Sequence, residues 1–330
     1  MAMASSALKY TLHYYGSDNY LQKLGVWEID PATAGAAAAD EQEYWVVYIH
    51  GGAWRDPRVA HETFAPTIDR LLAPAASGGN GGDGGAATAA AIAGFASIDY
   101  RLSPHPQFPQ DPATTPADQY RGARHPDHLD DVRSALAFLQ RAYPSACDYV
   151  LVGHSAGGAL AFQLLASTGD DAGAGADQPA LPAAIVAFEG LYDFTGVDGR
   201  FDGAYASFFR AAFGDEPAGW DAAAPAKFAG SYAARWPGGR LALLGWSPDD
   251  TLVDGPEVDT MARRLRDLDG FVEDGRDGNG EKGAEEGGRP GEKRLLVLKD
   301  LRGDHNEIWQ SGEDVARMVR VALRKLDAGL

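Results

Sequence analysis

Residues 148–167 read DYVLVGHSAGGALAFQLLAS, and this stretch decides the fold. Its first part has the apolar composition of a buried strand, and its last part has a helical pattern. Between them the letters GHSAG, residues 153–157, match the G-x-S-x-G nucleophile elbow, a sharp turn that exposes a serine hydroxyl at a strand end. The chain has 41 glycines, so a chance match is the alternative. The strand before Ser155 and the helix after it favour the elbow.

Short apolar runs alternate with helical patterns along the rest of the chain. Several of the runs are nearly continuous in Val, Leu, Ile and aromatic residues, as in strands buried on both faces of a parallel sheet. The alternation predicts an α/β fold with a mostly parallel central sheet flanked by helices. Strands are expected at 24–29, 44–49, 94–102, 148–153, 183–190, 240–246 and 294–300, and helices at 125–144, 156–168, 258–268 and 314–326.

Three stretches fall outside this scaffold. Residues 76–91 and 273–293 are rich in glycine and poor in apolar residues, which predicts flexible or disordered loop insertions. Residues 104–126 are rich in Pro, Asp and Gln, and they form either a cover over a site or a long loop. We find no internal repeat and no linker, so residues 1–330 are predicted to form a single domain.

The composition and charge of the chain exclude several classes of function. The chain has 29 basic and 47 acidic side chains and a formal charge of −18, which argues against nucleic acid and against anionic membrane surfaces. Cys147 is the single cysteine, so no intramolecular disulfide and no cysteine-based zinc site can form. The N-terminus has no secretory signal pattern, and no apolar run has the length of a membrane span. We predict a soluble cytoplasmic protein.

A serine hydroxyl is a weak nucleophile without a neighbouring base. In chains built on this elbow, an acid and then a histidine follow the serine at the ends of later strands. Of the eight histidines, His305 alone follows Ser155, and it stands a few residues past the expected strand 294–300. His305 is therefore the predicted base. His154 is expected to pack or to form a local hydrogen bond.

The acid should follow the expected strand 240–246, where the sequence reads SPDDTLVD. This stretch offers Asp249, Asp250 and Asp254. Asp250 is the first candidate because the two apolar residues after Thr251 can turn back onto the core, and Asp249 is the second. The carboxylate would hold the imidazole tautomer and balance the imidazolium that forms during the reaction.

The letters YIHGGAWRDP, residues 48–57, place two glycines directly after an expected strand. A plain turn is one interpretation. In the elbow architecture, amide groups of such a loop and of the residue after the nucleophile bind the oxyanion of the tetrahedral intermediate. Gly52, Ala53 and Ala156 would donate these hydrogen bonds, and Gly51 would allow the close approach. Each such donor can lower the barrier by about 3 kcal/mol.

Three blocks together, HGGAWRDP, GHSAGG and GDHNEIW, resemble the kynurenine formamidases (arylformamidases), in particular the short fungal type of the α/β-hydrolase fold. His50, Gly51, Gly52 and Trp54 match the HGGxW motif of that family. The resemblance runs from about residue 8 to about residue 325, apart from the two glycine-rich insertions. HGGxW alone is not specific, because related esterases and lipases carry similar motifs.

The resemblance implies hydrolysis of N-formyl-L-kynurenine to L-kynurenine and formate in tryptophan degradation, with no metal or organic cofactor. Carried over to this chain, Ser155 is the nucleophile, Asp250 the acid and His305 the base, and the intermediate is a formyl-serine. The partner would be a small-molecule substrate, and the resemblance is compatible with a homodimer. The long insertions depart from the family pattern without touching a motif.

An aryl amine leaving group predicts an aromatic wall. Trp54 and Trp309 are the first candidates for substrate binding because they lie within motif loops. Arg55 and Arg101 are candidates to bind the substrate carboxylate, although both could be solvated surface residues. The remaining rings at strand ends or in motif loops are Tyr100, Phe108, Tyr192 and Phe194, and for each of them the sequence favours ordinary core packing over substrate binding.

Two other functions stay open at this stage. A carboxylesterase or lipase-like hydrolase of short acyl or aryl esters would use the same residues. A catalytically inactive α/β-hydrolase that acts as a binding protein is disfavoured, because Ser155 and His305 are both present.

Overall fold

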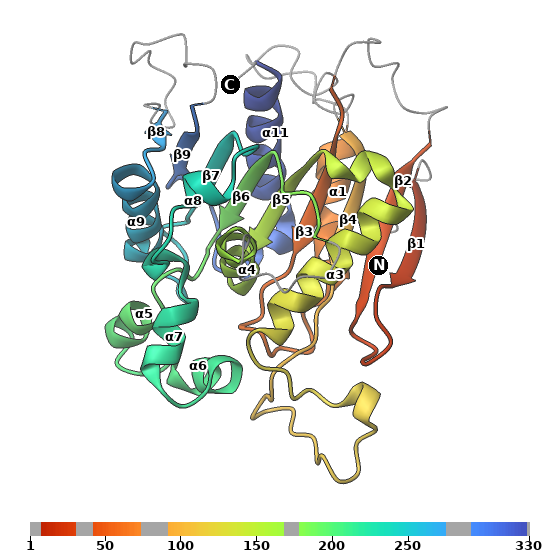
Figure 1. Cartoon of the computed structure of the whole chain (residues 1–330), viewed down its shortest axis with the longest axis vertical. Helices are drawn as coiled ribbons and strands as arrows, with labels where there is room; N and C mark the ends of the chain where they lie inside the picture. Colours follow the sequence, from red (N-terminus) through yellow and green to blue (C-terminus); the bar gives the residue numbers. More distant parts are fainter. Residues whose placement is uncertain (1–7, 31–41, 74–91, 168–177, 275–291, 329–330) are drawn as a thin grey trace.

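A mixed sheet runs through the centre of the computed structural model, which describes residues 8–30, 42–73, 92–167, 178–274 and 292–328 (Figure 1). Within these residues the strand order is β1-β2-β4-β3-β5-β6-β7-β9-β8. The pairs β1–β2 and β2–β4 are antiparallel, and every other neighbouring pair is parallel. The strands are β1 (Leu8–Tyr14), β2 (Lys23–Ile29), β3 (Tyr44–Ile49), β4 (Ile92–Ile98), β5 (Tyr149–His154), β6 (Ala184–Phe188), β7 (Leu241–Gly245), β8 (Val272–Glu273) and β9 (Arg294–Leu298).

The seven predicted strands are confirmed, with ends that differ by a few residues. β4 differs most, since it ends at Ile98 and the four residues after it belong to a loop. Two strands were not predicted, namely β1 and the two-residue β8. β1 is an edge strand whose residues are half-buried or exposed, so it lacks the continuous apolar run that marks the central strands.

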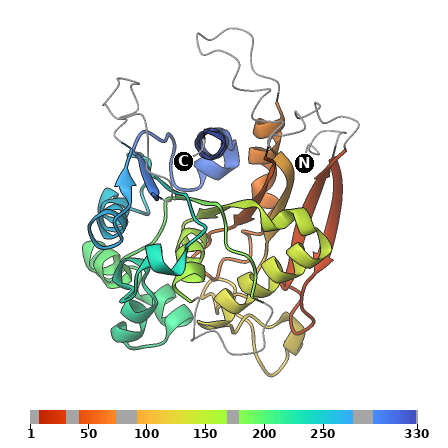
Figure 2. The same ribbon diagram turned by 45° about the horizontal axis from the view of Figure 1, so that its top comes forward.

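Helices cover both faces of the sheet. Figure 2 shows α1 and α11 on one side and α3 and α4 on the other. Alternate residues of β3 point to opposite faces, so Val47 and Ile49 join one apolar cluster while Val46 and Tyr48 join the second. The helices of these layers are α1 (Ala65–Leu72), α3 (Asp127–Ala142), α4 (Ala156–Ala166), α9 (Gly255–Arg263), α10 (Glu307–Ser311) and α11 (Glu313–Asp327).

The four predicted helices are present as α3, α4, α9 and α11. The helix predicted over 258–268 is α-helical only to Arg263, and a π-helical turn, Arg264–Leu268, completes it. The predicted insertion 76–91 lies outside the described residues, and so does most of 273–293. None of the helices in the described ranges is long and apolar enough to cross a membrane.

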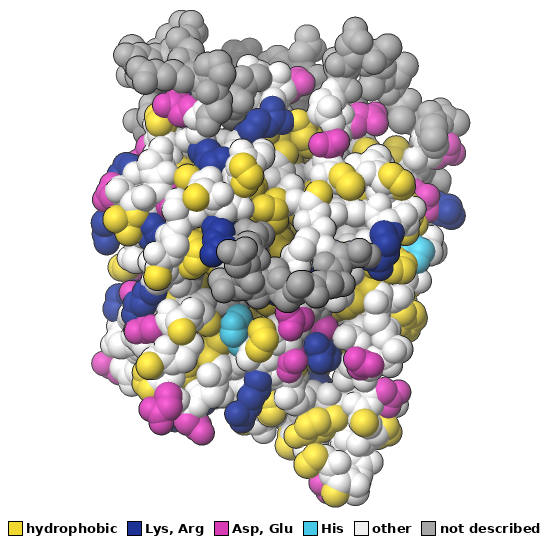
Figure 3. All heavy atoms as spheres, viewed as in Figure 1, with side chains coloured by type: hydrophobic (Ala, Val, Ile, Leu, Met, Phe, Trp, Pro, Cys, Tyr) yellow, Lys and Arg dark blue, Asp and Glu magenta, His cyan; other side chains and the backbone are white. Residues whose placement is uncertain are grey.

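A helical excursion between β6 and β7 was not predicted. Part of it, together with the loop after β4, forms the lower end of the molecule in Figure 1. Its helices are α5 (Phe194–Arg200), α6 (Ala206–Phe213), α7 (Pro217–Ala223) and α8 (Tyr232–Arg235). On the face drawn in Figure 3, Lys and Arg side chains are scattered among Asp and Glu rather than gathered in one patch.

The parallel strands place their carboxyl ends in register. Ile49 of β3 lies opposite Gly153 of β5, and His154 lies opposite Phe188 of β6. Phe188 in turn pairs with Gly245 of β7, which pairs with Leu298 of β9. The loops that follow these strands therefore emerge at one edge of the sheet. The predicted triad and oxyanion-hole residues lie in these loops or at the start of α4, whereas Trp309 lies in α10.

Candidate active site

Ser155 occupies the turn between β5 and α4. Its φ of 53° and ψ of −118° lie in a region that few non-glycine residues adopt, and its side chain is buried. A Cβ added to Gly153 would lie 2.5 Å from the carbonyl oxygen of Gly157, and one added to Gly157 would lie 2.1 Å from that of Ile49. Both glycines are therefore sterically required, as in a nucleophile elbow.

His305 and Asp250 form a hydrogen-bonded pair at the ends of the loops that follow β9 and β7. Nδ1 of His305 lies 2.8 Å from Oδ2 of Asp250. The second oxygen, Oδ1, accepts hydrogen bonds from the N–H groups of Leu252 (2.7 Å) and Val253 (2.9 Å). Because a carboxylate only accepts, Nδ1 carries the hydrogen, and Nε2 is the basic nitrogen of the ring.

Electrostatics keep Asp250 ionised. Burial of its carboxyl group acts to raise the pKa of Asp250, but hydrogen bonds from His305, from Glu189 and from the backbone outweigh burial and lower it to about 2. The other two candidate acids have different partners. Asp249 is exposed and accepts from the N–H of Gly303 at 3.3 Å, and Asp254 pairs with Arg200 at 2.6 Å. The structure thus brings Asp250 to His305.

Glu189 is a buried acid that the sequence interpretation missed. It follows β6 with a φ of 51°, and its Oε1 accepts from the N–H of Ser247 at 2.9 Å. As a carboxylate, its Oε2 would have no hydrogen-bond donor. Burial, with a further contribution from the adjacent Asp250, raises the pKa of Glu189 to about 11. The raised pKa favours the neutral carboxylic acid form of Glu189 next to Asp250.

Glu189, Asp250 and His305 are also the group in the described part of the chain whose ligand atoms could hold a metal, since these atoms lie within 4.8 Å of one another. The same atoms make the hydrogen bonds just described. A sequence signal for Glu189 did exist, because it directly follows a buried strand, as the acid and the histidine follow theirs.

The loop after β3 lies against the elbow. A Cβ added to Gly51 would be 2.9 Å from Cβ of Ser155, so only glycine fits there. Gly52, Ala53 and Trp54 have φ values of 88°, 49° and 59°, three consecutive positive angles that turn the backbone sharply. Among the described residues no acceptor contacts the N–H of Gly52 or of Ala53. These amides are therefore available to a ligand.

Neighbouring side chains hold this loop in place. The Tyr100 hydroxyl donates to the carbonyl oxygens of His50 (3.1 Å) and Gly51 (3.0 Å), and the rings of Tyr100 and His50 stack at 4.4 Å. Burial lowers the pKa of His50, so the ring is neutral. His154 makes the expected local hydrogen bond, from Nε2 to the carbonyl oxygen of His305 at 3.1 Å.

One cavity of about 300 Å³ brings the predicted groups together. Ser155, His305, Gly52 and Ala53 all line it. Ala156 directly follows Ser155 as the first residue of α4. The remaining wall is mostly apolar and includes Val59, Leu191, Tyr205, Phe208, Leu252 and Val253.

The aromatic wall differs from the prediction. Trp54 has no exposed surface, and its ring packs against Phe213 at 4.9 Å and Phe194 at 5.4 Å instead of lining the cavity. Trp309 donates from Nε1 to Asn306 at 3.1 Å and does not line the cavity either. The positive φ of Trp54 turns its side chain into the core. Tyr205 and Phe208, from the excursion after β6, are the rings that line the cavity.

The two arginines that were candidates for the substrate carboxylate have different surroundings. Arg101 pairs with the buried Asp131 at 2.8 Å, whereas Arg55 lines the cavity. Of the other predicted rings, Tyr192 and Phe194 are buried in the core, and Phe108 lines a neighbouring hollow.

No family model matches the chain. Among curated proteins, a kynurenine formamidase-like hydrolase of Fusarium equiseti is 33% identical over 86% of this chain and 84% of its own length. A kynurenine formamidase of Aspergillus versicolor is 32% identical over 82% of this chain and 86% of its own length.

Solved structures share the fold at low identity. Esterase B from Lactobacillus rhamnosis has a TM-score of 0.60 at 13% identity, covering 97% of this chain and 87% of that one. A thermostable esterase from Pseudomonas putida has a TM-score of 0.55 at 17% identity, covering 98% and 82%. With the identity to the fungal proteins spanning most of both chains, these findings show that the chain belongs to the kynurenine formamidase family of α/β-hydrolases.

Proposed function

We propose that the protein is an arylformamidase that hydrolyses N-formyl-L-kynurenine to L-kynurenine and formate, with Ser155, Asp250 and His305 as its catalytic triad. The observation that carries the proposal is the cavity in which Ser155, the His305–Asp250 pair and the loop of Gly52 and Ala53 meet. Similarity to fungal proteins named kynurenine formamidase supports this choice among hydrolases.

In the first step, Nε2 of His305 accepts the hydroxyl proton of Ser155 while Oγ attacks the formyl carbon. The carboxylate of Asp250 balances the imidazolium that forms. The formyl oxygen becomes an oxyanion, which the N–H groups of Gly52, Ala53 and Ala156 stabilise. Each of these donors can contribute about 3 kcal/mol to lowering the barrier.

In the second step, the carbon–nitrogen bond breaks, and the proton on His305 moves to the departing aryl amine. This leaves a formyl ester on Ser155 and free kynurenine. Water then attacks the ester carbon while His305 takes its proton, and formate leaves as Ser155 regains its hydrogen.

The cavity suits such a substrate. A formyl group is the smallest acyl group and fits the crowded space between the elbow and the loop after β3. The aryl group would contact Tyr205, Phe208 and Leu252, which line the 300 Å³ cavity. A well-placed ring pair contributes about 0.5–1.5 kcal/mol beyond simple burial.

Formate release from N-formyl-L-kynurenine by the purified protein tests the proposal. Wild type should release formate and kynurenine in equal amounts, and Ser155→Ala should fall to background. Ser311→Ala is the matched control, because the Ser311 hydroxyl lies on α10, where it donates to the carbonyl oxygen of Ile308 and accepts from the N–H of Glu313. Wild-type turnover by Ser155→Ala would show that another group is the nucleophile.

A carboxylesterase is the second candidate, favoured by the esterase neighbours of the fold. The ratio of kcat/KM for N-formylkynurenine and p-nitrophenyl acetate separates the two activities. A large preference for the ester would contradict the formamidase assignment. A fluorophosphonate probe that labels wild type but not Ser155→Ala would exclude an inactive binding protein.

A further inference from the structure

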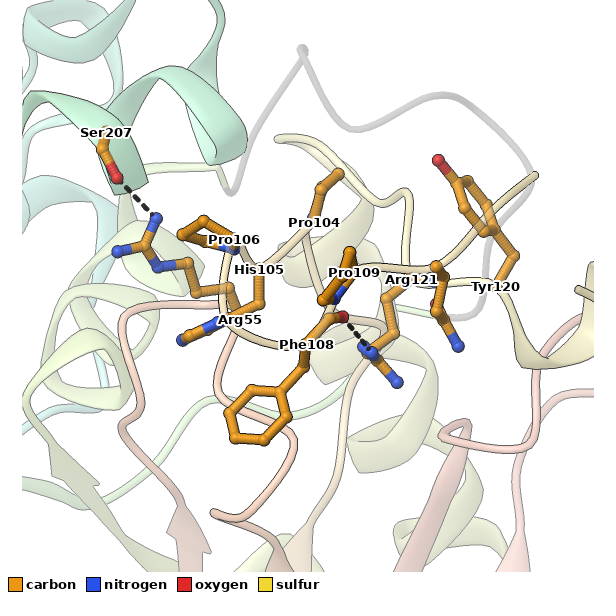
Figure 4. A pocket seen from close by; sticks show the side chains of 10 residues that line it. Arg55, Pro104, His105, Pro106, Phe108, Pro109, Tyr120, Arg121 and Ser207 are labelled. Carbon is orange, nitrogen blue, oxygen red and sulfur yellow. Dashed lines mark hydrogen bonds between the residues drawn. The ribbon is translucent and has the colours of Figure 1, made fainter.

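A second hollow of about 360 Å³ adjoins the catalytic cavity (Figure 4). The two spaces share Arg55 and His105 as lining residues. Three segments build the second hollow: the loop after β3, the loop after β4, and the first turn of α6 with Ser207. The hollow therefore adjoins the catalytic cavity at Arg55 and His105, within reach of a group that extends from a substrate bound there.

The charge of this hollow is opposite to that of the chain. Arg55 and Arg121 line it and no carboxylate does, although the whole chain has a formal charge of −18. Figure 4 shows the two arginines on either side of the turn that carries His105 and Pro109. Two guanidinium groups without a lining acid form a local positive field that attracts an anion.

Both arginines retain unused hydrogen-bond donors. Arg55 donates from Nη1 to Ser207 at 2.8 Å and forms no ion pair with any described residue. Arg121 donates from Nη2 to the carbonyl oxygen of Phe108 at 2.7 Å, and its buried Nε has no partner. The nearby Arg58 differs, because Asp56 pairs with it at 2.7 Å. Arg55 and Arg121 are thus the cations open to a ligand.

His105 adds a neutral donor. Its Nδ1 accepts from the N–H of Gln107 at 3.1 Å, so the hydrogen of the neutral ring lies on Nε2. Burial lowers the pKa of His105, and the charges of Arg55, Arg58 and Arg121 lower it further, while Asp56 opposes them. The ring therefore experiences the positive field of the hollow directly.

We propose that this hollow is a carboxylate subsite, in which Arg55 binds an anionic carboxylate on the leaving group of the substrate and Arg121 and His105 add donors. Arg55 is suited to this role because it lines both spaces and follows the oxyanion loop by two residues. A guanidinium can bind a carboxylate through two parallel hydrogen bonds. The amino-acid identity of the leaving group rests on the proposed function, whereas the charge preference of the subsite does not.

The test compares substrates that differ only in charge. One pair is N-formyl-L-kynurenine and its neutral α-carboxamide, and a second pair is a phenyl acetate with a side-chain carboxylate and its carboxamide. Wild type should favour the carboxylate in kcat/KM by roughly 10-fold or more, the scale of one charge-assisted hydrogen bond. Arg55→Met should bring this ratio close to one, and Arg55→Lys should retain part of it.

The ratio within one variant does not depend on how much of the protein is folded, so partial misfolding cannot imitate the result. Arg70→Met on α1 is the control, since it removes the same charge far from the hollow and should keep the wild-type ratio. A wild-type ratio near one, or an unchanged ratio in Arg55→Met, would overturn the subsite. If wild type prefers the anionic ester yet releases no formate, the subsite stands and the formamidase proposal fails.

Discussion

Asp249 and Asp250 are adjacent in the chain, yet their carboxylates have different surroundings. The side chain of Asp250 is fully buried and contacts His305, whereas Asp249 is exposed. The sequence predicted that the acid lies within this stretch, because in the elbow architecture the acid follows the serine after a later strand. The choice between neighbours required side-chain direction, which the loop conformation after β7 determines.

The first prediction concerns this pair. Asp250→Asn should reduce kcat/KM for N-formylkynurenine by roughly 10³–10⁴-fold, because an amide that donates to Nδ1 holds the wrong imidazole tautomer. Asp249→Asn is the matched control and should stay within about 3-fold of wild type, since a surface change is usually small. Steady-state kinetics measure both, and equal losses in the two variants would contradict the assignment.

The second prediction concerns Glu189 and pH. Its folded pKa of about 11 stands far above the ordinary value of 4.5. Folding must protonate Glu189 at any pH between these values, so the stability that depends on this proton is complete below 4.5 and falls as pH rises. In Glu189→Gln the amide offers a donor and an acceptor without proton uptake. The free energy of unfolding of the variant should therefore increase relative to that of wild type as pH rises, by at most about 1.4 kcal/mol per pH unit.

Thermal unfolding of both proteins between about pH 5 and pH 8 measures this difference. Glu216 is exposed, and Glu216→Gln serves as the control. Its difference in stability from wild type should not change with pH. If the difference for Glu189→Gln is also independent of pH, Glu189 is not protonated in the folded protein.

Among the secondary-structure elements, the central strands were easier to predict than the edge strands and the short helices. β5 and β6 are buried at every position, and such strands appear in sequence as continuous apolar runs. The helices α5 to α8 are short, and α8 has only four residues, so no apolar period could develop. For this reason the wall of the cavity, which includes Tyr205 and Phe208, was missed, whereas the predicted triad residues follow strands that the sequence did predict.

Trp54 and α6 give the third prediction. Because Trp54 packs among Phe194, Phe208, Phe209 and Phe213, Trp54→Ala should lower the free energy of unfolding by about 3–5 kcal/mol. It should not change the ratio of kcat/KM for N-formylkynurenine and p-nitrophenyl acetate. Trp54→Phe provides a milder change should the alanine variant fail to fold.

Phe208→Ala is the matched comparison, since this ring lines the cavity. It should reduce kcat/KM for N-formylkynurenine more than that for p-nitrophenyl acetate, because the p-nitrophenyl group is smaller than the kynurenine leaving group and makes fewer contacts with this wall. Denaturant titration and kinetics on both substrates measure the two effects. If Trp54→Phe reduced kcat/KM for N-formylkynurenine but not for p-nitrophenyl acetate, Trp54 would contact the substrate after all.

At the scale of the whole molecule, one sheet separates two apolar clusters that share its strands. Neither cluster can lose its packing while the strands stay ordered, so we propose that the chain is a single domain. The fourth prediction is one cooperative unfolding transition. Calorimetric and van't Hoff enthalpies should agree.

Two variants sharpen this prediction. Leu136→Ala removes a buried side chain from the apolar cluster that α3 covers, and Leu323→Ala removes one from the opposite cluster, which α11 covers. Each should shift the entire transition to lower temperature, by roughly 3–7 °C for a loss of about 2–5 kcal/mol. A second transition that appears in one variant would indicate two independently folding units.

The predicted catalytic groups and the residues of the cavity wall come from different parts of the architecture. Ser155, Asp250, His305 and the loop of Gly52 lie directly after strands of the sheet, whereas Tyr205 and Phe208 belong to an excursion that adds no strand. Substitutions or length changes in that excursion can therefore alter which acyl compounds are accepted while the reacting groups keep their positions. For a chain of this family, a new acyl substrate can be reached by changing wall residues such as Tyr205 and Phe208, with Glu189 and the sheet left as they are.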